Sequence, residues 1–159
     1  MSFFEWKERM SVGDEMVDSD HQKLIGYLNE MHEAMIAGRG KQVVGEILDK
    51  LVAYTKEHFA REEALWKGGH YAGIEQHRKE HHACLATVTE LKAKYATGGV
   101  ALAIDVMNFL RDWLKTHTLK SDKEAADAIA AAKLASSCKV CTSRKRAHAA
   151  RRLPRAPTS

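Results

Sequence analysis

Two segments with histidines at helical spacing flank a pair of glycines in the sequence HFAREEALWKGGHYAGIEQHRKEH, residues 58–81. His58 and Glu62 lie four residues apart before Gly68, and His77 and His81 lie four residues apart after it. Residues four apart share one face of an α-helix, and glycine is typical of the turn where a helix ends. The stretch therefore predicts an antiparallel helical hairpin with four potential metal ligands on its apolar faces.

The rest of the chain continues this pattern in both directions. Glycines also cluster at 38–40 and 98–99, both prolines lie at 154 and 157, and apolar residues recur at helical spacing between the clusters. The sequence predicts an all-α fold, an up-down-up-down antiparallel four-helix bundle with a non-periodic N-terminal arm over residues 1–17. We expect the first helix to take its N-cap from Asp18, Ser19 or Asp20.

The charge is divided unevenly along the chain. The net charge is +4, but residues 1–127 carry −4, whereas residues 128–159 hold 8 Lys and Arg and no acidic residue. The end of the chain also contains both prolines and lacks an apolar stripe. We therefore expect a helical-bundle domain over 1–134 and a disordered basic C-terminal tail over 135–159. Because the basicity lies in this tail, it is no evidence for a nucleic-acid partner, and we expect none.

Several protein classes are excluded by composition. No run of 18 apolar residues exists, so we expect no membrane span. Residues 1–10 contain no apolar secretory segment, which favours a cytoplasmic location. Three cysteines cannot form a disulfide framework, and Cys84 is expected in the core. We expect a monomer.

Five of the nine histidines and two carboxylates fall at one height along the predicted bundle. In an antiparallel hairpin, residues equidistant from the turn lie side by side. For each pair of these residues on successive predicted helices, the midpoint between the two residue numbers falls beside the glycines of the turn that joins the helices. The sequence therefore predicts a metal site in one layer of the bundle, with the ligands His21, His58, Glu62, His77, His81, His117 and Asp122.

The number and type of these ligands indicate more than one metal ion. Five imidazoles and two carboxylates exceed the four ligands of tetrahedral zinc. They suit two six-coordinate ions with bridging carboxylates, and they are compatible with iron, with manganese or zinc as substitutes. No Glu is followed by His three residues later, which argues against a ferritin-like di-iron site.

The spacing of His117 and Asp122 is the exception to regular helical geometry. Five residues correspond to a rotation of about 140° on an α-helix. Either Asp122 reaches around the helix, or the helix contains a local i,i+5 turn there.

These residues resemble the hemerythrin family, specifically its single-domain bacterial members, over residues 3 to 132. The matching motifs are Asp-Ser-Asp-His at 18–21, His-Phe-x-x-Glu at 58–62, His-x-x-x-His at 77–81 and His-x-x-x-x-Asp at 117–122. The resemblance implies two iron ions and no haem. His77, His81 and His117 would hold one iron and His21 and His58 the other, bridged by Glu62, Asp122 and an oxo or hydroxo group.

The function that the resemblance implies is reversible, non-enzymatic dioxygen binding for storage, delivery or buffering, with an oxygen-consuming enzyme as a partner. Such a protein needs a dry pocket. Side chains beside the ligands match the family's pocket positions, namely Leu24, Phe59, Trp113 and Leu114. Thr118 follows His117 where the family often has a bulky aliphatic residue, so its hydroxyl is expected to admit water and hasten autoxidation.

Other functions stay open at this point. A dioxygen or redox sensor is the first alternative, although signalling hemerythrins usually need an attached output domain. Iron or peroxide handling is the second. The pattern His77-x-x-Glu80-His81 also matches inverted zinc peptidases, with Glu80 as general base. Cys138 and Cys141 form a Cys-x-x-Cys pair without two further zinc ligands nearby.

Overall fold

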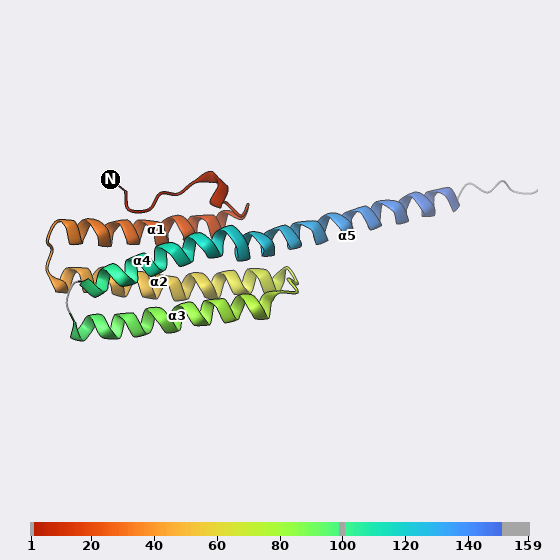
Figure 1. Cartoon of the computed structure of the whole chain (residues 1–159). Helices are drawn as coiled ribbons and strands as arrows, with labels where there is room; N and C mark the ends of the chain where they lie inside the picture. The colour runs from red at the N-terminus through yellow and green to blue at the C-terminus, as the bar shows by residue number, and fades with distance from the viewer. Residues whose placement is uncertain (1, 99–100, 151–159) are drawn as a thin grey trace, which may run out of the picture.

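Four antiparallel helices form the bundle. The computed structural model describes residues 2–98 and 101–150, in which no strand occurs. The elements are α1 (Glu15–Ile36), α2 (Lys41–Gly68), α3 (Ile74–Thr97), α4 (Ala101–His117), the π-helical turn η2 (Thr118–Asp122) and α5 (Lys123–Ala150). The first four run alternately up and down, and α5 continues the direction of α4 (Figure 1). The predicted all-α bundle is confirmed.

Glycines lie at the predicted connections between helices. Gly38 follows α1 with a φ of +64°, a left-handed conformation that glycine adopts without steric cost. Gly69 ends α2 against the side chain of Ile129, where a Cβ atom would collide. These turns keep the helical hairpins short, so residues equidistant from a turn lie at the same height in the bundle.

The N-terminal arm packs along the bundle between α1 and α4. Asn29 on α1 exchanges two hydrogen bonds of 2.9 Å with the backbone of Phe4, and Arg111 on α4 lies 4.9 Å from the ring centre of Phe3. A short 3-10 turn, η1 (Glu8–Met10), precedes α1. Phe4 and Met10 are buried, so the arm covers part of the core.

The start of α1 differs from the sequence prediction. The N-cap is Asp14, whose carboxylate accepts hydrogen bonds from the backbone of Met16 and Val17. Asp18 instead accepts hydrogen bonds from Ser11 and Val12 and ties down the arm. The prediction of an N-cap at 18–20 was wrong because a second capping-type residue lies one turn earlier.

Two apolar clusters lie on either side of the histidine layer. The larger cluster contains Leu24, Phe59 and Leu114 and fills the bundle toward the α1–α2 connection. The smaller cluster contains Val17, Trp66, Ala125 and Ile129 at the opposite end. Since the predicted ligands fall between these clusters along each helix, the polar layer is sealed from solvent at both ends.

Helix α5 begins inside the bundle and projects beyond it (Figure 1). Ala125 and Ile129 are buried, whereas Leu134 is exposed. The chain is helical as far as Ala150, although the sequence predicts disorder from 135. The alanine-rich composition and the lack of glycine and proline over residues 123–153 explain this difference. The predicted tail residues 151–159 lie outside the described residues. No helix in the described part has the length and hydropathy needed to cross a membrane.

Candidate metal centre

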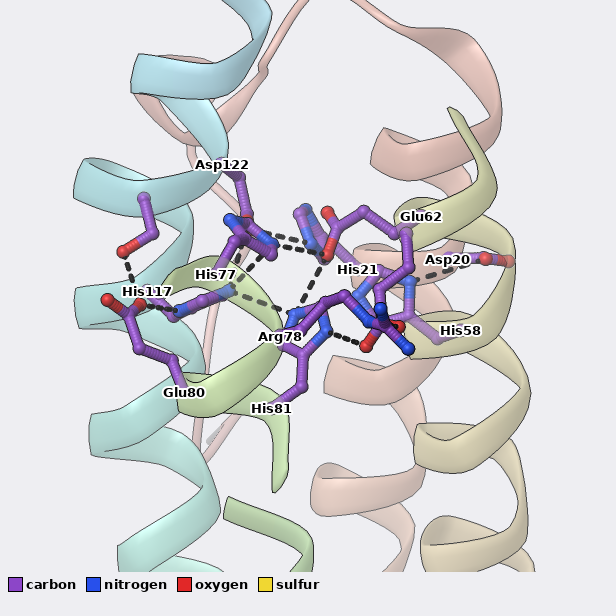
Figure 2. Close-up of polar contacts among 12 residues, drawn as sticks. Asp20, His21, His58, Glu62, His77, Arg78, Glu80, His81, His117 and Asp122 are labelled. Atoms are coloured by element: carbon purple, nitrogen blue, oxygen red, sulfur yellow. Dashed lines mark hydrogen bonds and ion pairs between the residues drawn. The ribbon is translucent and has the colours of Figure 1, made fainter. Parts of the chain in front are cut away.

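Each bundle helix contributes at least one predicted ligand to a single buried layer (Figure 2). The seven side chains are at most 5% exposed. They form two overlapping groups whose potential ligand atoms lie within 4.8 Å of one another. The first group is Glu62, His77, His81, His117 and Asp122, and the second is His21, His58 and Glu62. The structure therefore brings together all the residues that the sequence predicts as ligands.

The three-histidine group turns its Nε2 atoms toward the two carboxylates. Glu62 Oε2 lies 3.2 Å from Nε2 of His77 and 3.1 Å from Nε2 of His81. Asp122 Oδ1 lies 3.0 Å from Nε2 of His117. The Nε2 atoms of His81 and His117 are themselves 3.1 Å apart. These nitrogen and oxygen atoms, all potential metal ligands, therefore surround one small volume.

The second group shares the carboxylates of the first. Asp122 Oδ2 lies 3.3 Å from Nε2 of His21, so the two oxygens of Asp122 face different histidine groups. The rings of His21 and His58 are 4.9 Å apart. Glu62 belongs to both groups. The carboxylates of Glu62 and Asp122 therefore lie between the two sets of imidazoles.

Buried polar atoms in this layer lack hydrogen-bond partners. Among the described residues, Nε2 of His58, Nε2 of His21, Oε1 of Glu62 and both carboxylate oxygens of Asp122 have none. Leaving one such atom buried and unpaired costs about 1–3 kcal/mol. Imidazole and carboxylate donors of this kind fit divalent iron, manganese or zinc, and cations bound in the layer would satisfy these atoms. The residues present therefore fit a metal centre.

The protonation states of the cluster also favour metal binding. Burial lowers the pKa of His58 and of His77, and burial together with His117 and His77 lowers the pKa of His81 to about 2. These imidazoles are therefore neutral at pH 7, with a nitrogen lone pair free to bind a cation.

The two buried carboxylates have opposite shifts. Burial and the neighbouring Asp122 raise the pKa of Glu62 well above its usual range. Burial opposes ionisation of Asp122 as well, but the neighbouring imidazoles of His117 and His21 hold its pKa well below the usual range. Without a cation, the layer therefore stabilises one negative charge more readily than two.

The π-helical turn η2 explains the spacing of His117 and Asp122. The five residues from Thr118 to Asp122 form a wider turn than an α-helix, and Asp122 is fully buried. A wider turn places residues five apart on the same face. The i,i+5 turn expected from the sequence is confirmed, and Asp122 does not face solvent.

Three carboxylates outside the layer contact predicted ligands, and the sequence did not predict these contacts. Each contacts the Nδ1 atom of a predicted ligand, and the pairs are Asp20 with His58, Glu63 with His81 and Glu80 with His117. Hydrogen bonds from Ser121 and the nearby His117 lower the pKa of Glu80, even though burial opposes this shift. The available signal was that each carboxylate is adjacent in sequence to a predicted ligand.

The contacts of Glu80 also argue against the zinc-peptidase pattern. Its carboxylate accepts a hydrogen bond of 2.6 Å from Ser121 and lies 3.0 Å from Nδ1 of His117, on the outer side of the imidazole. A general base must reach a water molecule held within the metal cluster. The side chains of Cys138 and Cys141 lie outside the described residues.

An apolar cavity lies against the histidine layer. It is lined by four residues expected from the sequence, Leu24, Phe59, Trp113 and Leu114, and also by Leu28, Leu51, Thr55 and Leu110. The ring of Phe59 stacks on His81 with centres 3.8 Å apart, and Trp113 stacks on His117 at 4.2 Å. Thr118 is fully buried but is not among the residues that line this cavity.

Comparison with known proteins agrees with this geometry. A family model described as the hemerythrin HHE cation binding domain matches residues 12–129. A bacteriohemerythrin of Stenotrophomonas maltophilia is 28% identical over 131 residues, which cover 82% of this chain and 84% of that protein. A bacteriohemerythrin of Methylococcus capsulatus is 30% identical over 106 residues, covering 67% and 80% of the two chains.

The comparison with solved structures also finds a hemerythrin. The crystal structure of a hemerythrin variant with a leucine-to-tyrosine substitution superposes with a TM-score of 0.73 and 25% identity. The match covers 81% of this chain and 98% of that chain. Because the family model spans most of the chain and the predicted cation ligands meet inside the bundle, the chain belongs to the hemerythrin family.

Proposed function

We propose that the seven buried side chains hold two iron ions. His77, His81 and His117 would bind one iron, and His21 and His58 the other. Glu62 and Asp122 would bridge, because their carboxylates lie between the two sets of imidazoles. The unpaired buried donor atoms support this assignment, since a single ion would leave part of the layer unsatisfied.

We further propose that this centre binds dioxygen reversibly and does not catalyse turnover. The observation that carries this proposal is the apolar cavity packed against the cluster. Its volume is about 10 Å³, at the lower limit of the space that one water molecule needs. A pair of reduced irons would supply one electron each to dioxygen and recover both when it leaves.

The lining residues of the cavity would keep the bound ligand away from water and acids. Thr55 carries the only side-chain hydroxyl among the cavity-lining residues that the structure describes, and it donates a hydrogen bond of 2.8 Å to the Leu51 carbonyl. The remaining lining side chains are aliphatic or aromatic. Low polarity at this position disfavours protonation and loss of reduced oxygen species, which is the side reaction that a reversible carrier must avoid.

The test is a cycle of oxygenation and deoxygenation. Protein loaded anaerobically with two Fe(II) per chain should develop visible absorption bands in air and lose them when oxygen is purged, over repeated cycles. His58→Ala should abolish this response. The control is His82→Ala, because His82 is exposed one position beyond His81. Irreversible oxidation in the first cycle, or rapid consumption of hydrogen peroxide by the diferric protein, would contradict reversible binding.

A further inference from the structure

Three predicted ligands are each contacted at Nδ1 by a carboxylate from the preceding helix. Figure 2 shows Asp20 near His58 and Glu80 near His117. The distances between Nδ1 and the carboxylate oxygen are 3.3 Å for His58 and Asp20, 2.9 Å for His81 and Glu63, and 3.0 Å for His117 and Glu80. An ionised carboxylate can only accept hydrogen bonds. When a cation is bound at the Nε2 atoms, the proton of each imidazole therefore resides on Nδ1, where the carboxylate accepts a hydrogen bond from it.

The carboxylate of Asp20 is also held by two other residues. The hydroxyl of Tyr54 donates a hydrogen bond of 2.5 Å to Oδ1, and Arg61 donates one of 2.9 Å from Nε to Oδ2 and places its Nη2 atom 2.8 Å from the same oxygen. Asp20 is only 6% exposed. Its position and its charge are therefore both constrained before any metal binds.

Glu63 and Glu80 are fixed in the same way. Arg78 donates a hydrogen bond of 3.1 Å to Glu63, and Ser121 donates one of 2.6 Å to Glu80. The side chains of Glu63 and Glu80 are 20% and 34% exposed. They can therefore be replaced without leaving a cavity in the core.

The arrangement follows the order of the helices. Asp20 on α1 contacts α2, Glu63 on α2 contacts α3, and Glu80 on α3 contacts α4. Each lies next in sequence to a predicted ligand on its own helix, namely His21, Glu62 and His81. Neighbouring residues on a helix differ by about 100° in direction. When one faces the layer, the next can therefore reach the adjacent helix.

We propose that Asp20, Glu63 and Glu80 are positioning residues that orient His58, His81 and His117 and strengthen them as iron donors. A charged acceptor at Nδ1 increases the electron density at Nε2, which stabilises the ferric state more than the ferrous state. This inference rests on iron as the bound metal, but it does not require reversible dioxygen binding.

The first test uses the metal-free full-length protein. Nitrogen-15 NMR of the imidazoles at neutral pH should find the proton on Nδ1 of His58 and His81. His117 is left out because its Nε2 atom lies 3.0 Å from Asp122. Protonation of Nε2 in the rings of His58 and His81 would overturn the proposal. This measurement is independent of iron and oxygen.

The second test uses Glu63→Gln and Glu80→Gln, which keep the side-chain size and remove the charge. Each should weaken Fe(II) binding about 10- to 100-fold in a chelator competition assay and raise the reduction potential of the iron centre. Glu75→Gln is the matched control, since Glu75 also contacts Arg78 but is 76% exposed and contacts no histidine. Far-UV circular dichroism checks that each variant is folded.

The outcomes separate this inference from the proposed function. Unchanged iron affinity and an unchanged potential in both Gln variants would overturn it, even if the parent protein binds dioxygen reversibly. If the parent fails to bind dioxygen reversibly while both variants lose affinity and shift in potential, the proposed function fails and the positioning role stands.

Discussion

Thr118 is the residue whose chemistry departs most from its surroundings. It directly follows His117, is fully buried, and its hydroxyl has no hydrogen-bond partner among the described residues. A buried hydroxyl without a partner is a binding point for water. Water at this position would reach the predicted ligand next to it, although Thr118 does not line the apolar cavity.

Removing this hydroxyl should slow autoxidation. Thr118→Val keeps the shape of the side chain, and Thr118→Ile also adds a methyl group. We expect both variants to lose their oxygenated absorption bands more slowly than the parent, and Thr118→Val to gain about 1 kcal/mol in unfolding free energy. The control is Thr87→Val, since the Thr87 hydroxyl lies on the exposed side of α3 and bonds to the Ala83 carbonyl. An unchanged or faster loss in both Thr118 variants would contradict this role.

The sequence identified the ligands well because their chemistry contrasts with their positions. A histidine on an apolar stripe needs a buried partner, and several at one height imply a shared one, as for His58 and His81. The contacts of Asp20, Glu63 and Glu80 were not predicted, because the chemistry of these residues does not contrast with their positions. A charged residue at the edge of a helical stripe is ordinary, and only coordinates show that each contacts an imidazole of the next helix.

The π-helical turn η2 is the element on which the position of Asp122 depends. Its extra residue rotates α5 relative to α4 and brings Asp122 onto the same face as His117, at 3.0 Å. The sequence predicted this turn only as one of two alternatives, because spacing alone does not separate a wider turn from a side chain that reaches around the helix.

Deleting Lys120 should convert η2 to a regular α-helical turn. Lys120 is exposed, so the deletion removes no buried side chain. Asp122 would then follow His117 by four residues, and α5 would rotate by about 100° about the helix axis relative to α4. We expect bound iron to fall below two per chain by elemental analysis. Deletion of Lys133, also exposed but beyond the buried part of α5, is the control and should leave two. Full iron content in the Lys120 deletion would show that η2 is dispensable.

Helix α5 should divide functionally at Ile129, the last buried residue among those whose side chains the structure describes. Ile129 is 9% exposed and packs in the smaller apolar cluster with Trp66. Deleting residues 136–159 should leave iron content and dioxygen binding intact. Deleting residues 128–159 should lower the unfolding free energy in urea by about 1.5–3 kcal/mol, because it also removes Ile129. Loss of iron in the shorter deletion would contradict this division.

The whole molecule is a bundle whose two apolar clusters enclose a polar layer. Val17 and Leu24 flank His21 on α1, and Phe59 and Trp66 flank Glu62 on α2. The helical spacing of apolar residues and the glycines at the turns predicted this architecture, because both signals depend on residues close together in the sequence. Local patterns did not predict the first turn of α1 or the helical continuation past 134, which depend on competing caps and on alanine content.

The metal-free protein should lose stability as the pH falls. Burial lowers the pKa values of His58, His77 and His81, so below about pH 6.5 the unfolded chain binds protons at these residues more readily than the folded chain does. The raised pKa of Glu62 acts in the opposite direction, but it involves one proton against three. Unfolding free energy in urea should therefore fall between pH 6.5 and 4.5 by about 1.4 kcal/mol per pH unit for each net proton.

A pair of histidine variants tests this pH dependence. His81→Gln should reduce the slope of stability against pH, whereas His82→Gln should not, because His82 is exposed. Equal slopes in the parent and in His81→Gln would show that the buried imidazole does not control acid unfolding.

Locating the metal within the bundle tests the account most directly. Crystals of the iron-loaded protein would be measured on both sides of the iron absorption edge, so that anomalous differences mark iron alone. We predict two iron positions per chain in the buried layer, one among His77, His81 and His117 and the other beside His21 and His58. A single position, or iron bound outside this layer, would contradict the two-iron centre.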